Sequence, residues 1–333
     1  MRPHLYRLAV DWAGSTNPDG TVDLAKPNPG CMRDKQPCAP YAGVKAQFEA
    51  IAAAQKEHPG RFEVLLVLTG TPEGLARPPG GCERAGIAPR SRPPRDEAVP
   101  VYADFIGKLQ DLARTTKAQI RYWSPWNEPN HPYFFSPQRS SCSAKSENAS
   151  IEPYELLAEA MADRLADGEE LVLGELAGLL KRKPGYTGVR EFISKMSSDL
   201  VCSVRIWTQH GYVGGPDPMD DVDRALRTHG CDTSHALWVT ETGVGAPRRG
   251  EQAKTSAKAL LRACRLIRGR LNDWFEDPRI DAAFQYTLRE DDRFPTGLVT
   301  TDLSKAFPAL DEWIAWSGDR DPVEEPPAST CAA

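Results

Sequence analysis

The chain has 333 residues, and 41 Lys and Arg against 46 Asp and Glu give it a net charge of −5. This weak negative charge, with no basic block, argues against nucleic acid or an anionic membrane as the main partner. An apolar content of 40% with 26% charged residues is that of a folded globular chain. No apolar run approaches the ~20 residues of a membrane span. The length admits two small domains or one large one, such as an α/β barrel.

Short apolar runs alternate with helical patterns along the whole chain. We expect strands at residues 5–11, 62–69, 120–125, 171–174, 204–209, 237–240 and 282–288. Helices are predicted between and after them at 44–56, 101–115, 153–166, 189–200, 219–228, 251–275 and 308–316. This alternation predicts a parallel sheet, either doubly wound or closed into a barrel. The glycine-rich phosphate-binding motif that often marks the open sheet is absent after the first strand.

The loops are long at one end of the predicted strands only. Segments 13–43, 70–100 and 129–152 all follow strand carboxyl ends, whereas the segments that enter strands are mostly short. In an α/β barrel the functional residues lie on loops of the first kind. We therefore expect a single barrel domain over residues 1–318, with its site on this face. Residues 319–333, rich in proline and acidic residues, are predicted to form a flexible tail.

Eight cysteines favour an oxidising compartment and hence an extracellular protein, although unpaired thiols in a cytosolic enzyme are the alternative. We expect a local disulfide between Cys31 and Cys38, which share a proline-rich loop. Cys264 lies on the apolar face of a predicted helix, which favours a buried thiol. Four others lie in long loops or directly before strands: Cys82, Cys142, Cys202 and Cys231. No spacing resembles a zinc site, and residues 1–12 hold no export signal.

Two glutamates each follow an apolar strand and lie close to aromatic residues. Glu128 belongs to Trp126-Asn127-Glu128-Pro129, and Glu241 ends the strand three later. Such a pair is difficult to explain as solvated surface charge, and the alternative is an ion pair that closes the top of the barrel. Paired carboxylates at strand ends are what glycosidic bond cleavage needs.

On these residues the chain resembles the retaining glycoside hydrolases of clan A, such as families 5 and 39, which have a (β/α)8 TIM barrel. Further similarity comes from Gln209-His210-Gly211-Tyr212 and from residues 286–292. The resemblance implies that Glu128 is the general acid/base and Glu241 the nucleophile of a double displacement on a carbohydrate substrate. It implies no metal or cofactor, and we expect a monomer.

The chemistry also predicts a property of Glu128. An acid that works near neutral pH must keep its proton, so we expect apolar surroundings and the charge of Glu241 to raise the pKa of Glu128. The resemblance further implies that Asn127 binds the sugar 2-hydroxyl and that Arg7 orients the nucleophile. The alternatives are a turn asparagine and an ordinary ion pair in the barrel floor.

The remaining candidate substrate-binding residues are predicted from their positions at strand ends. Tyr212 is a candidate donor to Glu241, and His210 either lines the same wall or is a buried core group. Trp207 and Trp238 lie in mid-strand and are predicted to be core residues. The other candidates are Asp11, Trp12, Trp126, Glu175, Tyr286, Arg289, Asp291 and Asp292.

The strand count gives seven βα units instead of eight, and by comparison with the clan the first unit is missing. This motivates a second hypothesis, a catalytically inactive sugar-binding barrel or a truncated gene product, since an open edge exposes unpaired backbone groups. An upstream segment that holds the first strand and an export signal is the corresponding expectation. A third hypothesis is a metal-dependent hydrolase that uses His210, although no His-x-His or HExxH spacing is present.

Overall fold

The computed structural model describes residues 3–27, 32–33, 36–37, 43–143, 145–179, 185–213, 217–231, 235–244, 256–290, 295–317 and 323–331. Seven parallel strands form one sheet in chain order: β1 (Leu5–Asp11), β4 (Glu63–Thr69), β5 (Tyr122–Ser124), β6 (Glu170–Leu176), β7 (Ile206–His210), β8 (Ala236–Thr242) and β9 (Ile280–Gln285). All seven were predicted, with ends shifted by at most three residues. A short ribbon of β2 (Met32–Arg33) and β3 (Gln36–Pro37) lies in the first long loop.

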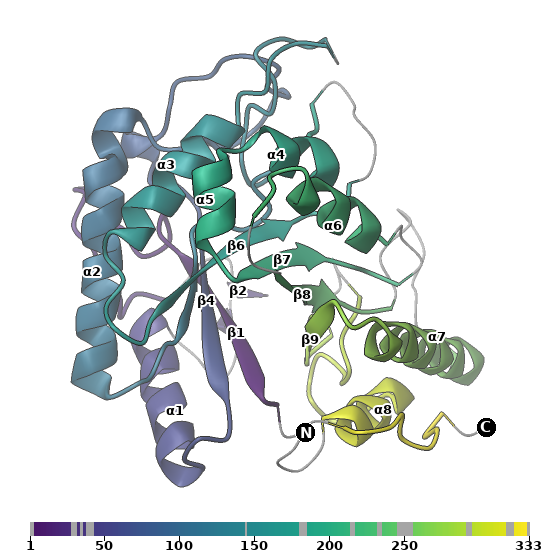
Figure 1. Ribbon diagram of the computed structural model, residues 1–333. Helices are drawn as coiled ribbons and strands as arrows, with labels where there is room; N and C mark the ends of the chain where they lie inside the picture. The colour runs from purple at the N-terminus through teal and green to yellow at the C-terminus, as the bar shows by residue number, and fades with distance from the viewer. Residues whose placement is uncertain are drawn as a thin grey trace.

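Helices follow the strands and pack around the outside of the curled sheet (Figure 1). They are α1 (Val44–Glu57), α2 (Val99–Thr116), α3 (Ile151–Ala162), α4 (Val189–Lys195), α5 (Ser198–Ser203), α6 (Met219–Arg227), α7 (Ala257–Glu276) and α8 (Pro308–Trp316). The single helix predicted at 189–200 is two helices, because Met196 and Ser197 take extended backbone angles between them. The chain thus has the βα alternation of a TIM barrel, with seven units.

The barrel is incomplete at the two edge strands. β1 and β9 approach each other to within 8 Å between Cα atoms, yet the sheet order places each at an edge, without ladder hydrogen bonds between them. The seven-unit barrel fold predicted from the sequence is confirmed. The strands still curl far enough that the carboxyl ends of β1 and β8 share one site, as described below.

Alternate side chains of the strands fill the inside of the barrel. Leu65, Val67, Tyr122, Val172, Ile206, Trp238 and Phe284 form a cluster distinct from the main core. The rings of Tyr122 and Trp238 meet edge to face with centroids 4.8 Å apart. Trp238 and Trp207 are both buried, as predicted for mid-strand tryptophans. The barrel interior is therefore a packed core that forms the floor beneath the strand carboxyl ends.

The outer core lies between the sheet and the helices, and α2 shows how the sequence builds it. Its buried residues Tyr102, Phe105, Ile106, Leu109 and Ala113 recur at intervals of three and four. This spacing makes one apolar stripe along a helix, which packs on the sheet.

Three disulfides are present among the described residues: Cys82–Cys142, Cys202–Cys231 and Cys264–Cys331. The first joins the long loops that follow β4 and β5. Cys264 is buried as predicted, but the expectation of a free thiol is wrong, because Cys331 near the chain end pairs with it. That disulfide fastens part of the segment expected to be a tail onto α7. Cys31 and Cys38 lie outside the described residues.

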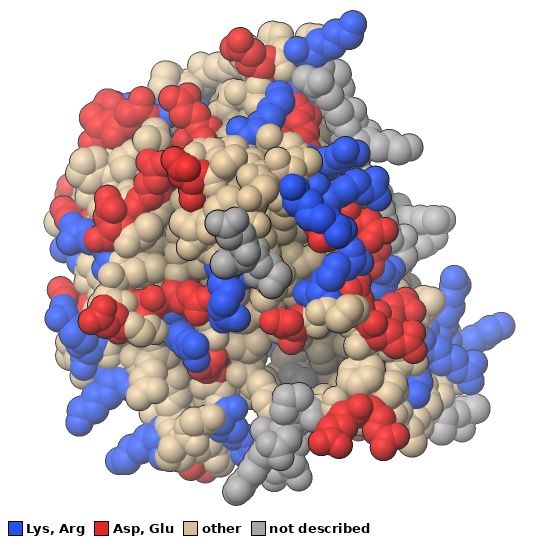
Figure 2. All heavy atoms as spheres, in the orientation of Figure 1, with Lys and Arg blue, Asp and Glu red and all other residues tan. Residues whose placement is uncertain are grey.

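The surface carries charges of both signs. Acidic and basic side chains are interspersed over the face in Figure 2. Among the described residues, no helix is both long and apolar enough to cross a membrane.

A glycine in β6 permits the local geometry on which the site depends. The register between β6 and β7 shifts between Leu173 and Leu176, and Gly174 within this bulge has φ of 112°. A Cβ atom at Gly174 would lie 2.1 Å from the carbonyl oxygen of Thr208. Only glycine fits both the backbone angle and this close approach.

We predict that Gly174→Ala lowers the free energy of unfolding by more than ~2 kcal/mol, measured by urea denaturation followed by circular dichroism. Gly269→Ala is the matched control, because Gly269 lies in α7 with no atom within 4 Å of an added Cβ. The control should be neutral or gain up to ~1 kcal/mol from helix propensity. Equal stability of Gly174→Ala and the wild type would contradict the assigned geometry.

Candidate active site

Charged and polar side chains converge where the strands end. They come from five strands or the residues just after them: Arg7 from β1, Asn127 and Glu128 after β5, Glu175 from β6, His210 and Tyr212 at and after β7, and Glu241 from β8. The carboxyl ends of parallel strands meet at one rim of a barrel, which explains why residues so distant in sequence come together.

Glu128 and Glu241 both approach the same ring nitrogen of His210. Nδ1 of His210 lies 2.8 Å from Oε1 of Glu128 and 3.4 Å from Oε2 of Glu241. One carboxylate oxygen of each glutamate and a ring nitrogen of His210 all lie within 4.8 Å of one another. Glu241 is 8% exposed, and the side chain of Glu128 is 14% exposed, so both are mostly shielded from solvent.

Both carboxylate oxygens of Glu241 have a polar partner. Arg7 Nη1 lies 2.9 Å from Oε1, and the hydroxyl of Tyr212 donates to Oε2 at 2.5 Å. Arg7 also donates to Oδ1 of Asn127 at 2.7 Å. Both of the contacts with Glu241 that the sequence predicted, from Arg7 and from Tyr212, are therefore present. Glu241 is therefore fixed in one orientation by contacts to both of its oxygens.

Glu175 is a third carboxylate, and it lies beneath the other two. Its side chain is completely buried, and Arg7 donates to its Oε2 from Nε at 2.9 Å and from Nη2 at 2.5 Å. Nε2 of His210 lies 3.2 Å from the same oxygen. Burial pushes the pKa of Glu175 upward, but the charge of Arg7 and the contacts of His210 outweigh it and lower the pKa to about 2. Glu175 is thus an anion with two cationic neighbours.

His210 is held as a cation by the carboxylates around it. Burial alone lowers the pKa of His210, but the charge of Glu241 and hydrogen bonds to Glu128 and Glu175 raise it to about 10. A protonated imidazole donates from both nitrogens, which suits the carboxylate oxygens on its two sides. The ring therefore links the completely buried Glu175 to Glu128, whose side chain is 14% exposed.

The expectation of a raised pKa for Glu128 is not met in this structure. Burial favours its neutral form, but the hydrogen bond and positive charge of His210, followed by the charges of His131 and Arg7, lower the pKa overall. The sequence pattern could not show that a histidine cation would lie 2.8 Å away. Glu128 and His210 titrate as a pair, and the proton that they share rests on His210 in the free site.

Unusual backbone angles position both Glu128 and Glu175. Their φ angles are 45° and 50°, in a region that residues other than glycine rarely adopt. The amide of Glu128 donates to the backbone carbonyl of Glu175 at 2.9 Å, so each conformation supports the other. The side chain of Asn130 adds two hydrogen bonds to the backbone of Ala177. The segment after β5 is thereby fastened to the end of β6.

Three further candidates are buried close to strand ends. The carboxylate of Asp11 accepts from Arg90 at 2.6 Å and from the amide of Gly14. Trp12 packs against two rings of α2, and Trp126 donates its indole N–H to the carbonyl of Phe134. The tryptophans are at most 1% exposed, which places them in the core behind the site and not on a surface that a ligand reaches.

The last candidates follow β9. Tyr286 is half-buried, and its amide donates to the carbonyl of Thr242, beside Glu241. Arg289 donates to the carbonyl of Thr301, so it contacts the closing segment of the chain. Asp291 and Asp292 lie outside the described residues.

An aromatic group beside Glu128 was not predicted. His131 Nδ1 lies 4.0 Å from Oε2 of Glu128, and the His131 ring packs against Tyr133, Phe134 and Tyr186 at centroid distances of 5.2, 5.9 and 5.5 Å. Tyr133 is 50% exposed. The run Tyr133-Phe134-Phe135, which follows Glu128 closely, is the sequence signal that was overlooked. Aromatic faces of this kind are suited to contact with the C–H faces of a sugar ring.

By distance alone, Glu128, His210 and Glu241 could also hold a metal ion. Their chemistry does not favour it, because both nitrogens of His210 face carboxylates and a protonated imidazole offers no lone pair to a metal. Arg7 and His210 already balance much of the local negative charge.

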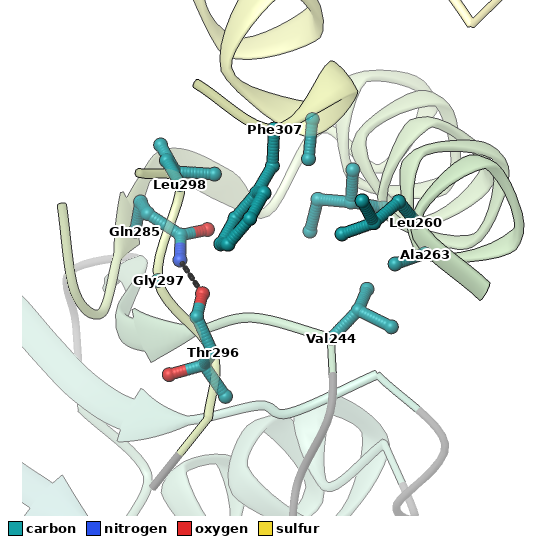
Figure 3. Close-up of a pocket in the computed structure, with 10 residues that line it drawn as sticks. Val244, Leu260, Ala263, Gln285, Thr296, Gly297, Leu298 and Phe307 are labelled. Atoms are coloured by element: carbon teal, nitrogen blue, oxygen red, sulfur yellow. Dashed lines mark hydrogen bonds between the residues drawn. The ribbon is translucent and has the colours of Figure 1, made fainter. Parts of the chain in front are cut away.

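A separate small cavity lies between the ends of β8 and β9 and helices α7 and α8 (Figure 3). Its walls are mostly apolar, with Leu260, Ala263 and Phe307 among them, and Gln285 donates to the carbonyl of Thr296 at 2.7 Å. None of the converging site residues lines this cavity.

No protein-family model and no curated protein matches the sequence. Solved structures do resemble the fold. The GH53 catalytic domain of Ignisphaera aggregans superposes with a TM-score of 0.53 at 14% identity, over 91% of this chain and 82% of that chain. A GH10 structure from Paenibacillus barcinonensis superposes with a TM-score of 0.52 at 13% identity, over 92% of both chains. A conserved exported protein from Bacteroides fragilis superposes with a TM-score of 0.55 at 14% identity, over 91% of this chain and 64% of that chain. The chain therefore has the barrel fold found in glycoside hydrolases.

The buried ion pair of Arg7 and Glu175 gives a prediction for stability. Arg7→Met leaves Glu175 buried with His210 as its only cationic contact, and we expect the free energy of unfolding to fall by ~3 kcal/mol. In the double variant with Glu175→Gln the unpaired anion is gone. Its loss of stability should then be smaller than the sum of the two single losses by ~1 kcal/mol or more. Urea denaturation of the four proteins measures this coupling, and additive losses would contradict it.

Proposed function

We propose that this chain is a retaining glycoside hydrolase of clan A, related to families 5 and 39, that cleaves β-linked O-glycosidic bonds in a polysaccharide or oligosaccharide. The observation that supports this proposal most directly is the pair Glu128 and Glu241. One carboxylate oxygen of each lies within 4.8 Å of the other at the rim of the barrel. Retaining enzymes hold their two carboxyl groups ~5–5.5 Å apart, whereas inverting enzymes leave room for a water between them. The fold and the three disulfides support the same assignment to a secreted hydrolase.

In the first step, Glu241 attacks the anomeric carbon while Glu128 donates a proton to the leaving glycosidic oxygen. Arg7 and Tyr212 fix both oxygens of Glu241, so its attack needs no rearrangement. The product is a glycosyl ester of Glu241 and a free leaving group. In the second step Glu128 takes a proton from water, the water oxygen attacks the anomeric carbon, and Glu241 leaves as a carboxylate.

The proton for the first step starts on His210. The hydrogen bond between Nδ1 of His210 and Oε1 of Glu128 gives it a direct route of 2.8 Å. A bound substrate displaces water from the site and makes the charged pair of imidazolium and carboxylate less favourable than the neutral pair. Glu128 then holds the proton at the moment the leaving oxygen needs it.

The aromatic group beside Glu128, His131, Tyr133 and Tyr186, places the leaving group. Glu128 must lie next to the bond that it protonates, so the sugar on the leaving side passes over this group. Tyr133 is 50% exposed and lies between the His131 ring and the guanidinium of Arg84, and we propose that its exposed part contacts a pyranose ring. Asn127, which Arg7 holds from the other side, is the proposed partner of the sugar 2-hydroxyl.

The alternative is a barrel that binds sugar without cleaving it, motivated by the incomplete sheet. The ordered contacts of Glu241 with Arg7 and Tyr212 favour catalysis, since a binding protein has no need of a carboxylate held ready to attack. Binding without turnover across a panel of glycosides would support the alternative.

Substitution of the two glutamates separates their roles. Glu241→Gln should abolish hydrolysis of every substrate, because the nucleophile is lost. Glu128→Gln should lower kcat/KM by ~10²–10⁴-fold for substrates with poor leaving groups but spare the kcat/KM of aryl glycosides whose leaving phenol needs no proton. Its kcat should fall for all substrates, because Glu128 also takes the proton from water in the second step. Release of substituted phenols from a panel of aryl β-glycosides measures both. Normal hydrolysis by Glu241→Gln would contradict the assignment.

The stereochemistry of the first product is an independent prediction. Two displacements at the anomeric carbon restore the β configuration, so NMR recorded within the first turnovers should show the β anomer. Activity should be unchanged by a chelator. An α anomer would mean that Glu241 activates water, and loss of activity with chelator would favour the metal-dependent alternative.

A further inference from the structure

We propose that Glu175 is a positioning residue that, through Arg7 and His210, holds the nucleophile and the acid/base of this site in their working geometry and charge. The inference rests on the proposed function and extends it to a third carboxylate, which carries neither the attack nor the proton transfer.

Burial excludes direct contact of Glu175 with a substrate. Its residue exposure is zero, whereas Glu241 and the side chain of Glu128 retain 8% and 14%. The two contacts to Arg7 and the one to His210 all reach the same oxygen, Oε2. A single anionic atom therefore organises both cations of the site.

Each of those cations touches one or both of the reacting glutamates. Arg7 extends from Glu175 to Oε1 of Glu241 at 2.9 Å, and His210 extends from Glu175 to Oε1 of Glu128 at 2.8 Å. Removal of the charge on Glu175 therefore changes the position and the charge environment of both Glu128 and Glu241, but removes no atom that faces the substrate.

The backbone of β6 is shaped to deliver this side chain. Gly174 and Glu175 form the bulge that turns the Glu175 carboxylate toward the barrel interior, where Val172 also points. Glu175 adopts a φ of 50°, a costly conformation that the surrounding contacts must hold and that is typical of functional sites. The amide of Glu175 donates to the hydroxyl of Thr208 at 2.6 Å, which fixes the bulge on β7.

Charged and polar groups from every element packed around Glu175 act on its charge and on those of Arg7 and His210. Arg7 approaches from β1, His210 from β7 and Glu241 from β8, while Glu128 follows β5. The hydroxyl of Tyr154 on α3 accepts from the amide of Gly174, and Thr240 on β8 lies beside Glu175. His131 and Tyr212 complete the set next to Glu128 and Glu241. With Arg7 and His210 positive, Glu175 is the fully buried anion that contacts both of them.

Loss of the Glu175 charge should shift the pH dependence of the reaction in one direction only. The negative charge stabilises the proton that Glu128 and His210 share, so its removal lets that proton leave at lower pH. The alkaline limb of the pH–rate profile should therefore move downward in Glu175→Gln, by about one pH unit or more. Because Glu175 does not touch substrate, kcat should fall ~10-fold or more while KM changes little.

The experiment combines this profile with an NMR titration of the His210 imidazole in the full chain, assigned by comparison with His210→Gln. In the wild type the ring should remain an imidazolium above pH 8. In Glu175→Gln its midpoint should move to lower pH by about one unit or more. The matched control is Glu312→Gln, because Glu312 is also fully buried and paired with an arginine, Arg268, at 2.7 Å, but lies on α8. The control should leave both the profile and the titration unchanged.

The outcomes separate this inference from the proposed function. A wild-type His210 that titrates near pH 6.5, or the same midpoint in Glu175→Gln and wild type, overturns the role of Glu175, and the first result needs no variant to fold. An equal shift in Glu312→Gln would also overturn it, because the effect would then be general. If no glycoside is hydrolysed but the His210 midpoint moves as expected, the proposed function fails while the charge role of Glu175 stands.

Discussion

The site depends on one buried arrangement of charge: Arg7 and His210 placed on either side of the carboxylate of Glu175. An anion in a protein interior is costly unless cations and hydrogen bonds compensate it, and here two cations do so from different strands. The same two cations then bind the pair of glutamates at the rim. The charge balance beneath the site and the chemistry at its surface are therefore one network, which links β1, β5, β6, β7 and β8.

The packed barrel interior makes this network possible. Tyr122, Trp238 and Phe284 fill the space below the charges and exclude water from the floor of the site. Low polarity below strengthens each interaction of Arg7 with its carboxylates. Disulfides hold outer parts of the same structure, and Cys82–Cys142 joins two of the long loops that rise from the rim.

Sequence patterns predicted the strands well because most are apolar runs, and inner strands such as β4 and β7 lie buried on both faces. Helix α8 was predicted at its observed bounds. They also brought Arg7, Glu128, His210, Tyr212 and Glu241 into one site, since parallel strands end at a common rim. The break between α4 and α5 was missed, because two extended residues leave no mark in the spacing of apolar side chains. The disulfide of Cys264 was missed because its partner, Cys331, is 67 residues away near the chain end.

The electrostatics of the site were less accessible from sequence. The expected rise in the pKa of Glu128 considered its burial and the charge of Glu241, but the position of His210 reverses the sign. Glu175 was recognised as a strand-end carboxylate, yet only the bulge at Gly174 decides that it points beneath the site. Trp12 and Trp126 were candidate substrate-binding residues from their positions at strand ends, whereas the neighbouring helix and loop cover their rings. These outcomes depend on distances of a few ångströms, which residue spacing does not specify.

In the proposed mechanism, Glu241 forms a covalent bond to the sugar. Incubation with a panel of 2-deoxy-2-fluoro β-glycosides that carry good leaving groups, followed by mass spectrometry of peptic peptides, tests it directly, because the fluorine slows the second step and traps the intermediate. The account predicts that one member of the panel adds the mass of a single fluorosugar to the peptide that contains Glu241. A label on another residue, or steady hydrolysis of natural β-glycosides by an enzyme that no member of the panel labels, would contradict it.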